Sequence, residues 1–243
     1  MCEIYREKRH TTYRLLGIKF NFLKDFLGYE IIGNGNKIFV EENGFLRELE
    51  NTEKIRNLNI QITGNDNKII LRAKSFYNCS ILLNCSNSNI EIGNNCRLND
   101  FHVSADCGNN QCLKIDENTT SFYTAVYLNE ENATLKIGKD CMLSGNISIW
   151  PTDGHAIFDK TTKDIINKPN ETIIGNHCWI GYGTHICKNT KLSNDIVVGA
   201  RSVVTKEFKE SNVIIAGNPA KIIKQNIDWN RDNASNLIKK QKQ

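Results

Sequence analysis

A single histidine in a polar segment is the first candidate for chemistry. His155 lies within TDGHAIFD, two residues after Asp153 and four before Asp159. A free imidazole has a pKa near ~6.5, so at pH 7 it is mostly neutral and can take a proton from a hydroxyl group. We therefore consider His155 a candidate general base, oriented by Asp153, by Asp159 or by a backbone carbonyl. A solvated surface histidine is the alternative.

The other histidines and the cysteines favour structural roles. His177 and His185 fall at a corner and a flanking position of the repeat described below, where solvated structural roles are expected. The nine cysteines are odd in number and no pair has CxxC spacing. This pattern argues against a disulfide scaffold or a zinc knuckle and favours a reducing cytoplasm. We expect most of the cysteines to be small buried apolar residues.

The carboxyl-terminal end of the chain is basic. Residues 201–243 contain nine Lys or Arg and only four Asp or Glu, whereas the whole chain has a net charge of +4. A basic end on a nearly neutral body predicts an anionic partner, and a merely solvated tail is the alternative. Aromatic residues do not alternate with the basic ones as on a stacking platform, so nucleic acid is not expected.

The composition is that of an ordinary globular protein, with 40% apolar and 24% charged residues. No uncharged apolar run approaches the ~18 residues that a transmembrane segment needs. The amino terminus, MCEIYREKRH, lacks the apolar core of a secretory signal, so a cytoplasmic protein is expected. The 33 asparagines suit a chain that turns often, because Asn tolerates left-handed backbone.

The element that must position these residues is a repeat. From residue 174 the chain divides into the hexads IGNHCW, IGYGTH, ICKNTK, LSNDIV and VGARSV, and a sixth begins at Val204. The first position of every hexad is aliphatic and the fifth is mostly small. A helix would repeat every 3.6 residues and a simple strand every 2, so neither explains the pattern. A short strand followed by a corner does explain it, with three hexads making one coil of about 18 residues.

Coarser repeats extend this solenoid toward the amino terminus. The aliphatic residues Ile69, Ile90, Leu113 and Leu135 recur at intervals of 21 to 23 residues, about one coil with a longer corner. The phase breaks once, between the strands that contain Ile149 and Ile174. The break predicts a loop thrown out of the solenoid, and such loops usually carry function.

The repeats divide the chain into three parts. Residues 1–30 form an amino-terminal cap segment, which is basic and amphipathic without a clear strand or helix phase. Residues 31–221 form the repeat domain, with the loop inserted at about 151–172. Residues 222–243 have a helical composition and are expected to form a helix or tail.

Residues 173–224 resemble the hexapeptide-repeat acyltransferases through the motifs IGxxCWIG, VGARSVVTK and AGNPAKIIK. Galactoside, maltose and capsular sialic-acid O-acetyltransferases are the nearest members, and the resemblance is strong over about 140–225 and weak over 1–110. It implies an all-β fold, a left-handed parallel β-helix with a protruding loop and a short carboxyl-terminal helix. It also implies a homotrimer with active sites between subunits, acetyl-CoA as co-substrate, and no required metal.

The resemblance also assigns site residues. In the family the catalytic base is a loop histidine 24 residues before the Trp of the WIG motif, which is Trp179 here, so the base is His155. Trp150 and Asp153 are weaker candidates for acceptor binding. The implied acetyl-CoA contacts are Trp179, Tyr182, Ala200, Thr205, Lys206, Lys221 and Lys224.

The function implied by the resemblance is O-acetylation of a sugar hydroxyl in a bacterial capsular or other surface polysaccharide, peripheral to the machinery that assembles the capsule. His155 would accept the hydroxyl proton during direct transfer, and a positioned base contributes ~10²–10⁴-fold. A small soluble acceptor, such as a free sugar, an amino sugar nucleotide or serine, is an alternative. A non-catalytic structural β-helix is another, although it would need neither a loop histidine nor a basic end. A zinc carbonic anhydrase of this fold needs three His ligands, and the spacing of His177 and His185 does not fit it.

Overall fold

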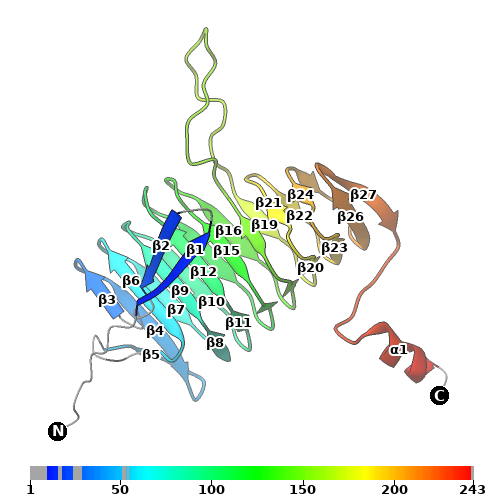
Figure 1. Ribbon diagram of the computed structural model, residues 1–243, viewed down its shortest axis with the longest axis horizontal. Helices are drawn as coiled ribbons and strands as arrows, with labels where there is room; N and C mark the ends of the chain where they lie inside the picture. The colour runs from blue at the N-terminus through cyan, green and yellow to red at the C-terminus, as the bar shows by residue number, and fades with distance from the viewer. Residues whose placement is uncertain (1–9, 16–17, 24–28, 51–52, 54, 242–243) are drawn as a thin grey trace.

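The computed structural model describes residues 10–15, 18–23, 29–50, 53 and 55–241. Within them the backbone winds into a solenoid with three long sheets, one on each side (Figure 1). Successive turns of the chain add parallel strands to each sheet in turn. Each coil is therefore bonded only to the coils above and below it, which is the architecture of a parallel β-helix.

The three sheets have the following strands. Sheet 1 contains β3 (Tyr29–Ile32), β6 (Leu58–Thr63), β9 (Cys79–Leu83), β12 (Phe101–Ala105), β15 (Thr124–Tyr127), β18 (Ile147–Ile149), β21 (His185–Ile186) and β24 (Val203–Val204). Sheet 2 contains β5 (Phe45–Glu48), β4 (Lys37–Glu42), β7 (Lys68–Leu71), β10 (Asn89–Ile92), β13 (Cys112–Ile115), β16 (Thr134–Ile137), β19 (Thr172–Ile174), β22 (Lys191–Leu192) and β25 (Glu207–Phe208). Sheet 3 contains β8 (Ser75–Tyr77), β11 (Arg97–Asn99), β14 (Thr120–Ser121), β17 (Met142–Leu143), β20 (Trp179–Ile180), β23 (Ile196–Val198), β26 (Val213–Gly217) and β27 (Ala220–Gln225).

The aliphatic position of each hexad fills the core. Ile174, Ile180 and Ile186 are at most 1% exposed, and each belongs to a different sheet. Burying such a side chain completely contributes roughly 1.5–3 kcal/mol relative to leaving it in water. The fifth positions, Cys178 and Thr184 among them, are also buried, where only small side chains fit the corner. Five of the eight cysteines in the described residues are buried in this core.

The register confirms how the coils stack. Ile90 pairs with Ile69 on one side and with Leu113 on the other, and Leu113 pairs with Leu135. The looser repeats of the first half and the strict hexads of the second half therefore belong to one continuous solenoid. The corners explain the asparagines: of nineteen non-glycine residues with positive φ in the described chain, twelve are Asn.

The two ends of the chain depart from the solenoid. At the amino-terminal end β1 (His10–Leu15) and β2 (Ile18–Leu23) form an antiparallel hairpin, so strands occur in the cap segment where the sequence had no clear phase. Residues 1–9, 16–17 and 24–28 of that cap lie outside the described residues. At the other end β27 turns back antiparallel to β26 and extends to Gln225, past the expected boundary at 222.

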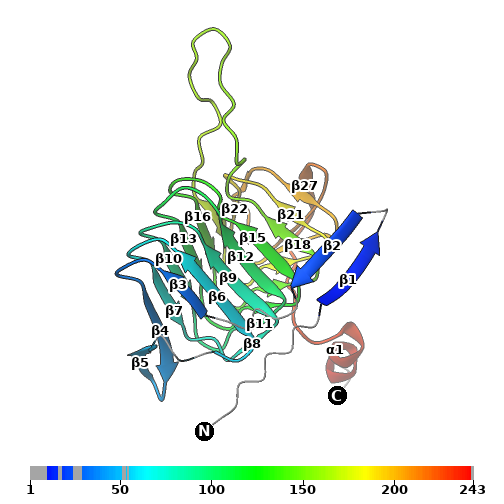
Figure 2. The same cartoon turned by 60° about the vertical axis from the view of Figure 1, so that its left-hand side comes forward.

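Residues 226–233, here called the strap, follow β27 and lead to the helix α1 (Ala234–Gln241). The helix therefore starts later than the composition suggested, because residues 220–225 find a strand partner in β26. No helix in the described part of the chain is long and apolar enough to cross a membrane. The predicted all-β solenoid with a protruding loop and a short carboxyl-terminal helix is confirmed (Figures 1 and 2).

Candidate active site

The protruding loop leaves the solenoid between β18 and β19, at the corner between sheets 1 and 2 (Figure 2). It closes on itself as a narrow hairpin: the Ile166 amide donates to the Ile157 carbonyl at 2.9 Å, and Phe158 forms a bridge with Ile165. The apolar side chains near its tip face solvent, with Phe158 56% and Ile166 65% exposed. An exposed apolar cluster of this kind usually marks a contact surface.

The base of the loop is held by a polar network around Lys188. The Lys188 ammonium contacts Asp153 Oδ2 and the Asn167 carbonyl, each at 2.6 Å. The Asn167 side-chain amide donates to Asp153 Oδ2 and to the His155 carbonyl, each at 2.8 Å. Burial alone would raise the pKa of Asp153, but the hydrogen bonds from Lys188 and Asn167 hold it below its ordinary value. These contacts pin both arms of the loop, so the position of His155 is set by the coil that carries Lys188.

His155 itself is exposed at the end of this network. The hydrogen bond from Asn167 fixes its backbone, and its imidazole has no hydrogen-bond partner among the described residues. The two carboxylates considered as orienting groups face elsewhere. Asp153 is engaged by Lys188 and Asn167, and Asp159 accepts the backbone amides of Thr161 and Thr162. Asp153 is therefore linked to the His155 backbone through the Asn167 amide, and among the described residues no hydrogen bond joins it to the ring.

The other histidines lie on the solenoid. His185 on β21 is half-buried, and burial lowers the pKa of its imidazole. Burial also lowers the pKa of His102, whose Nδ1 is 2.9 Å from the Ser80 hydroxyl. Neutral, partly buried imidazoles on strands are suited to packing, in contrast to the exposed loop position of His155.

Trp150 stands at the root of the loop. Its ring stacks on Tyr127 with centroids 4.2 Å apart, and its indole N–H donates to the Ser148 hydroxyl at 2.7 Å. This half-buried aromatic pair stiffens the point at which the chain leaves β18. Trp150 therefore supports the root of the loop, and it stays a candidate for acceptor binding.

Trp179 lies on the outer face of sheet 3, where it meets the strap. Its indole N–H donates to the Ser144 hydroxyl at 3.0 Å, and its ring is 5.9 Å from that of Trp229. Trp229 in turn stacks on His177 at 4.4 Å and donates its own indole N–H to the His177 carbonyl. One edge of Trp179 is thus fixed by the protein, while 37% of the residue stays exposed.

The strap is fastened to several coils at once. The Arg231 guanidinium donates to the Thr120 hydroxyl, the Asp140 carboxylate and the Cys141 carbonyl. His177 Nδ1 lies 3.0 Å from Asp195, and its ligand atoms with those of Asp195 and Asp228 lie within 4.8 Å of one another. This is the one cluster of His and carboxylate groups of metal-binding size in the described residues, and its His177–Asp195 contact joins two neighbouring coils while Asp228 comes from the strap.

The implied cofactor residues fall into two groups. Tyr182 and Ala200 are exposed at the corner between sheets 3 and 1, one coil apart. One cavity of about 340 Å³ at the carboxyl-terminal end is lined by Lys206, Lys209 and Lys221, by Phe208 and Ile222, and by the acidic Glu207 and Glu210. The Lys206 ammonium lies 5.3 Å from the centre of the Phe208 ring. The three lysine ammonium groups outnumber the two carboxylates, and with the Phe208 ring they suit an anionic ligand that has a flat apolar part.

Thr205 and Lys224 lie beside this cavity without lining it. Thr205 follows β24, directly before Lys206, and Lys224 is on β27 opposite Ile214. Three further residues belong to the arrangement that the sequence did not reveal: Lys188, Asn167 and Lys209. Lys188 and Asn167 could not be found from the repeat, because both make their contacts across the inserted loop.

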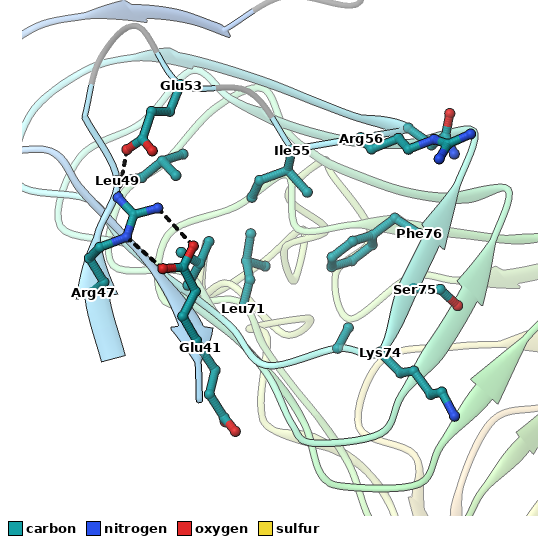
Figure 3. A pocket seen from close by; sticks show the side chains of 14 residues that line it. Glu41, Arg47, Leu49, Glu53, Ile55, Arg56, Leu71, Lys74, Ser75 and Phe76 are labelled. Carbon is teal, nitrogen blue, oxygen red and sulfur yellow. Dashed lines mark hydrogen bonds and ion pairs between the residues drawn. The ribbon is translucent and has the colours of Figure 1, made fainter. Parts of the chain in front are cut away.

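A second cavity, of about 590 Å³, lies at the amino-terminal end of the solenoid. Figure 3 shows its apolar floor, formed by Ile55, Leu71 and Phe76, beside an ion-pair network at one edge. There Arg47 contacts Glu53 at 2.6 Å and Glu42 at 3.0 Å. Arg56 and Lys74 also line this cavity, and its three basic residues are balanced by three acidic ones, Glu41, Glu42 and Glu53.

The loop and the strap lie apart on the solenoid. The loop with His155 extends from one edge of the solenoid, whereas the strap and α1 lie at the opposite edge (Figures 1 and 2). Among the described residues no hydrogen bond or ion pair joins the loop to Lys206, Lys221 or Tyr182. Lys206, between β24 of sheet 1 and β25 of sheet 2, lies two coils further along the corner from which the loop leaves.

Comparison with known proteins gives consistent results. No protein-family model matches the chain. A polysialic acid O-acetyltransferase of Neisseria meningitidis is 34% identical over 189 residues, which cover 69% of this chain and 87% of that protein. One of Escherichia coli O1:K1 / APEC is 32% identical over 108 residues, 44% of this chain and 35% of that protein. Among solved structures, the polysialic acid O-acetyltransferase OatWY is 28% identical with a TM-score of 0.53, over 84% of this chain and 92% of that one. The polySia-specific acetyltransferase NeuO is 25% identical with a TM-score of 0.54, over 89% and 88%.

Proposed function

This chain belongs to the hexapeptide-repeat acyltransferases and is an O-acetyltransferase of capsular polysaccharide, and we propose that its acceptor is a sialic-acid polymer. The observation that carries the proposal is the 34% identity along 87% of a polysialic acid O-acetyltransferase. The solenoid is left-handed, as in that family. The exposed loop histidine and the basic cavity supply the two functions that such a transfer requires.

His155 is the proposed general base. A sugar hydroxyl is a weak nucleophile at neutral pH and must lose its proton as it attacks the thioester carbonyl. The His155 imidazole accepts that proton while the new C–O bond forms, and the proton then passes to the departing thiolate as the C–S bond breaks. The products are the acetyl ester and a free thiol. A backbone amide of a coil is suited to stabilise the oxyanion between these steps.

Acetyl-CoA is the proposed acetyl donor. The ammonium groups of Lys206 and Lys221, joined by Lys209, suit its phosphates, and the Phe208 ring provides an apolar surface beside them. Lys224 and Thr205 flank this cavity. Tyr182 and Ala200 at the neighbouring corner are suited to contact the pantetheine arm, and Trp179 to form a wall near the thioester. None of these contacts requires a metal ion.

A homotrimer with active sites between subunits is the proposed assembly. The loop extends outward from the solenoid (Figure 1), and we infer that a neighbouring solenoid presents the donor to His155. The exposed apolar tip of the loop is the surface that would pack on that neighbour. It consists of Ile157, Phe158, Ile165 and Ile166, which are 49% to 65% exposed. We infer a cytoplasmic enzyme peripheral to capsule assembly.

Thiol release tests the proposed function directly. The purified protein is incubated with acetyl-CoA and polysialic acid, and the free thiol is measured with a chromogenic disulfide. Free sialic acid, galactosides and serine serve as small soluble acceptors in parallel. Polymer-dependent release, with O-acetyl groups detected on the polymer, is the expected result. Faster release with any small acceptor would contradict the proposal.

A further inference from the structure

The outer face of sheet 3 exposes aromatic side chains in a row. Tyr77 is 62% exposed, Phe122 65% and Trp179 37%. The aromatic face, as we call it, comprises these three residues and Arg97, which is also exposed. Large apolar side chains that remain in water along one face of a solenoid usually mark a binding surface.

The strand register places Tyr77, Arg97 and Phe122 on three successive coils and Trp179 two coils further on. Tyr77 pairs with Asn99 on β11, the strand that also carries Arg97. Phe122 follows β14 directly, and Trp179 lies on β20, which pairs with β17. From β8 to β20 there are four strand-to-strand steps, which span ~19 Å at ~4.8 Å per step. Trp179 is in register with Arg97 through Met142 and Thr120, and Phe122 lies two residues beyond Thr120, so the rings form a staggered track along the axis of the solenoid.

The track continues around the corner toward the proposed donor site. Gly145 has the Tyr182 ring beside it: a Cβ there would lie 3.1 Å from Tyr182 Cδ2 and 3.5 Å from Phe122 Cδ1. The absence of a side chain at Gly145 thus lets the two rings approach each other. Tyr123, 45% exposed, lies edge-on to His102 on the same corner.

Arg97 gives this apolar track a positive charge. In the described residues the arginines that form ion pairs are Arg47, Arg72 and Arg231, and Arg97 is not among them. The strap forms one margin of the face, because Arg231 donates to Thr120 and Trp229 lies beside Trp179. A ligand on this face would meet flat apolar rings, one guanidinium and the strap.

We propose that the aromatic face binds the acceptor polymer along several sugar units away from the reacting hydroxyl. This inference rests on the proposed function, since it concerns the acceptor of that same reaction. The apolar C–H faces of sugar rings suit Tyr77 and Phe122, and a sugar carboxylate suits the forked donors of Arg97. An acidic polysaccharide lying parallel to the axis would pass from this track to the corner at Tyr182.

The rival occupant is a second copy of the chain. Charged residues are depleted at the centre of protein interfaces, because burying an unpaired charge is costly. Arg97 pairs with Ser75 and Thr120, each two residues before Tyr77 and Phe122, so an interface that covered these two rings would bury it too. Its position favours an anionic ligand that remains hydrated at its edges.

Acceptors of different length distinguish the two possible occupants of the aromatic face, the acceptor polymer and a second copy of the chain. Kinetics are measured for Phe122→Ala and Arg97→Ala with long polysialic acid and with a trisaccharide, and Lys114→Ala on β13 of sheet 2 serves as control. Binding of labelled polymer is measured in the same variants in a His155→Ala background. Both aromatic-face variants should raise the KM and the Kd for long polymer roughly tenfold. They should leave the KM for acetyl-CoA, the trisaccharide kinetics and the subunit mass unchanged.

Three results would overturn this assignment: an unchanged KM for long polymer, an equal change for the trisaccharide, or a smaller subunit assembly by light scattering. The last result would identify the face as an interface between copies. Failure of the wild type to acetylate polysialic acid would refute the proposed function alone. The polymer Kd of the variants would then still decide whether this face binds an acidic polysaccharide.

Discussion

The Lys188 ammonium lies 2.6 Å from Asp153 Oδ2, and this ion pair ties the protruding loop to the coil that follows it. Lys188 is only 16% exposed, so the contact is shielded from water more than an ordinary surface pair. Through Asn167 the same network reaches the backbone of His155. The loop therefore extends far from the solenoid, but the segment that attaches it to the coils is held in place.

Removing the Lys188 ammonium should displace His155, the proposed general base, and leave its imidazole in place as a group. We expect Lys188→Met to lower kcat by up to ~10²-fold, because a displacement of about 1 Å at a reacting group can cost that much. The KM for acetyl-CoA should not change. Lys188→Arg should recover part of the activity, since it restores a cation, and Lys139→Met is the control. A rise in KM for acetyl-CoA with unchanged kcat would contradict this positioning role.

Acid should loosen the base of the loop. The pKa of Asp153 in the folded chain is below its ordinary value of 3.8, so its stabilising contacts are complete above that pH and are lost as the pH falls below it. Hydrogen exchange at the Gly154 and Ile157 amides, corrected for intrinsic rates, should accelerate below about pH 4 more than at the Gly138 amide in the solenoid. Asp153→Asn cannot titrate and should lack the difference. An identical acid response in that variant would exclude Asp153 as its source.

Loss of the imidazole should abolish transfer and spare the fold. His155→Ala should lower kcat by ~10²–10⁴-fold, the usual contribution of a general base, with normal circular dichroism and acetyl-CoA binding. The matched change His185→Ala should have little effect, because that half-buried ring lies on a strand. Retained activity in His155→Ala, with loss in His185→Ala or His102→Ala, would move the base to the solenoid.

Charge reversal in the lysine cavity should act on the donor. Lys206→Glu or Lys221→Glu should raise the KM for acetyl-CoA about 10- to 100-fold, because each change removes a charge-assisted hydrogen bond to phosphate. Lys209→Glu should behave similarly, since its side chain lines the same cavity. Lys114→Glu on sheet 2 provides the control for net charge. Equal KM values for acetyl-CoA in the wild type and all of these variants would show that acetyl-CoA binds outside the lysine cavity.

The mass in solution tests the assembly. We expect light scattering to give three times the chain mass of 27.6 kDa at micromolar concentration. Replacing the apolar loop tip by Phe158→Asp and Ile166→Asp should weaken the assembly, because these exposed side chains are proposed to pack on a neighbour. A wild-type protein that stays at the mass of one chain while transferring acetyl groups would refute a shared active site.

The sequence predicted the repeat because the spacing of its aliphatic residues can be read from residues that are close together in the chain. Ile174, Ile180 and Ile186 are buried as their spacing requires, and the phase break after Ile149 marks the loop. The network of Lys188 could not be read in this way, because Asp153 lies 35 residues earlier, on the far side of the insertion. Lys209 was missed for a similar reason, since it lines its cavity with a residue from β27.

The strap changes how the solenoid can come apart. In a plain β-helix each coil is stabilised only by its neighbours, so terminal coils can fray one after another. Arg231, however, is bonded to Asn118, 113 residues earlier, and Trp229 is bonded to His177. The coils from Asn118 onward can then loosen only after the strap is released, which makes them one cooperative unit. During synthesis this unit closes only after the strap has left the ribosome and reaches coils that have already formed.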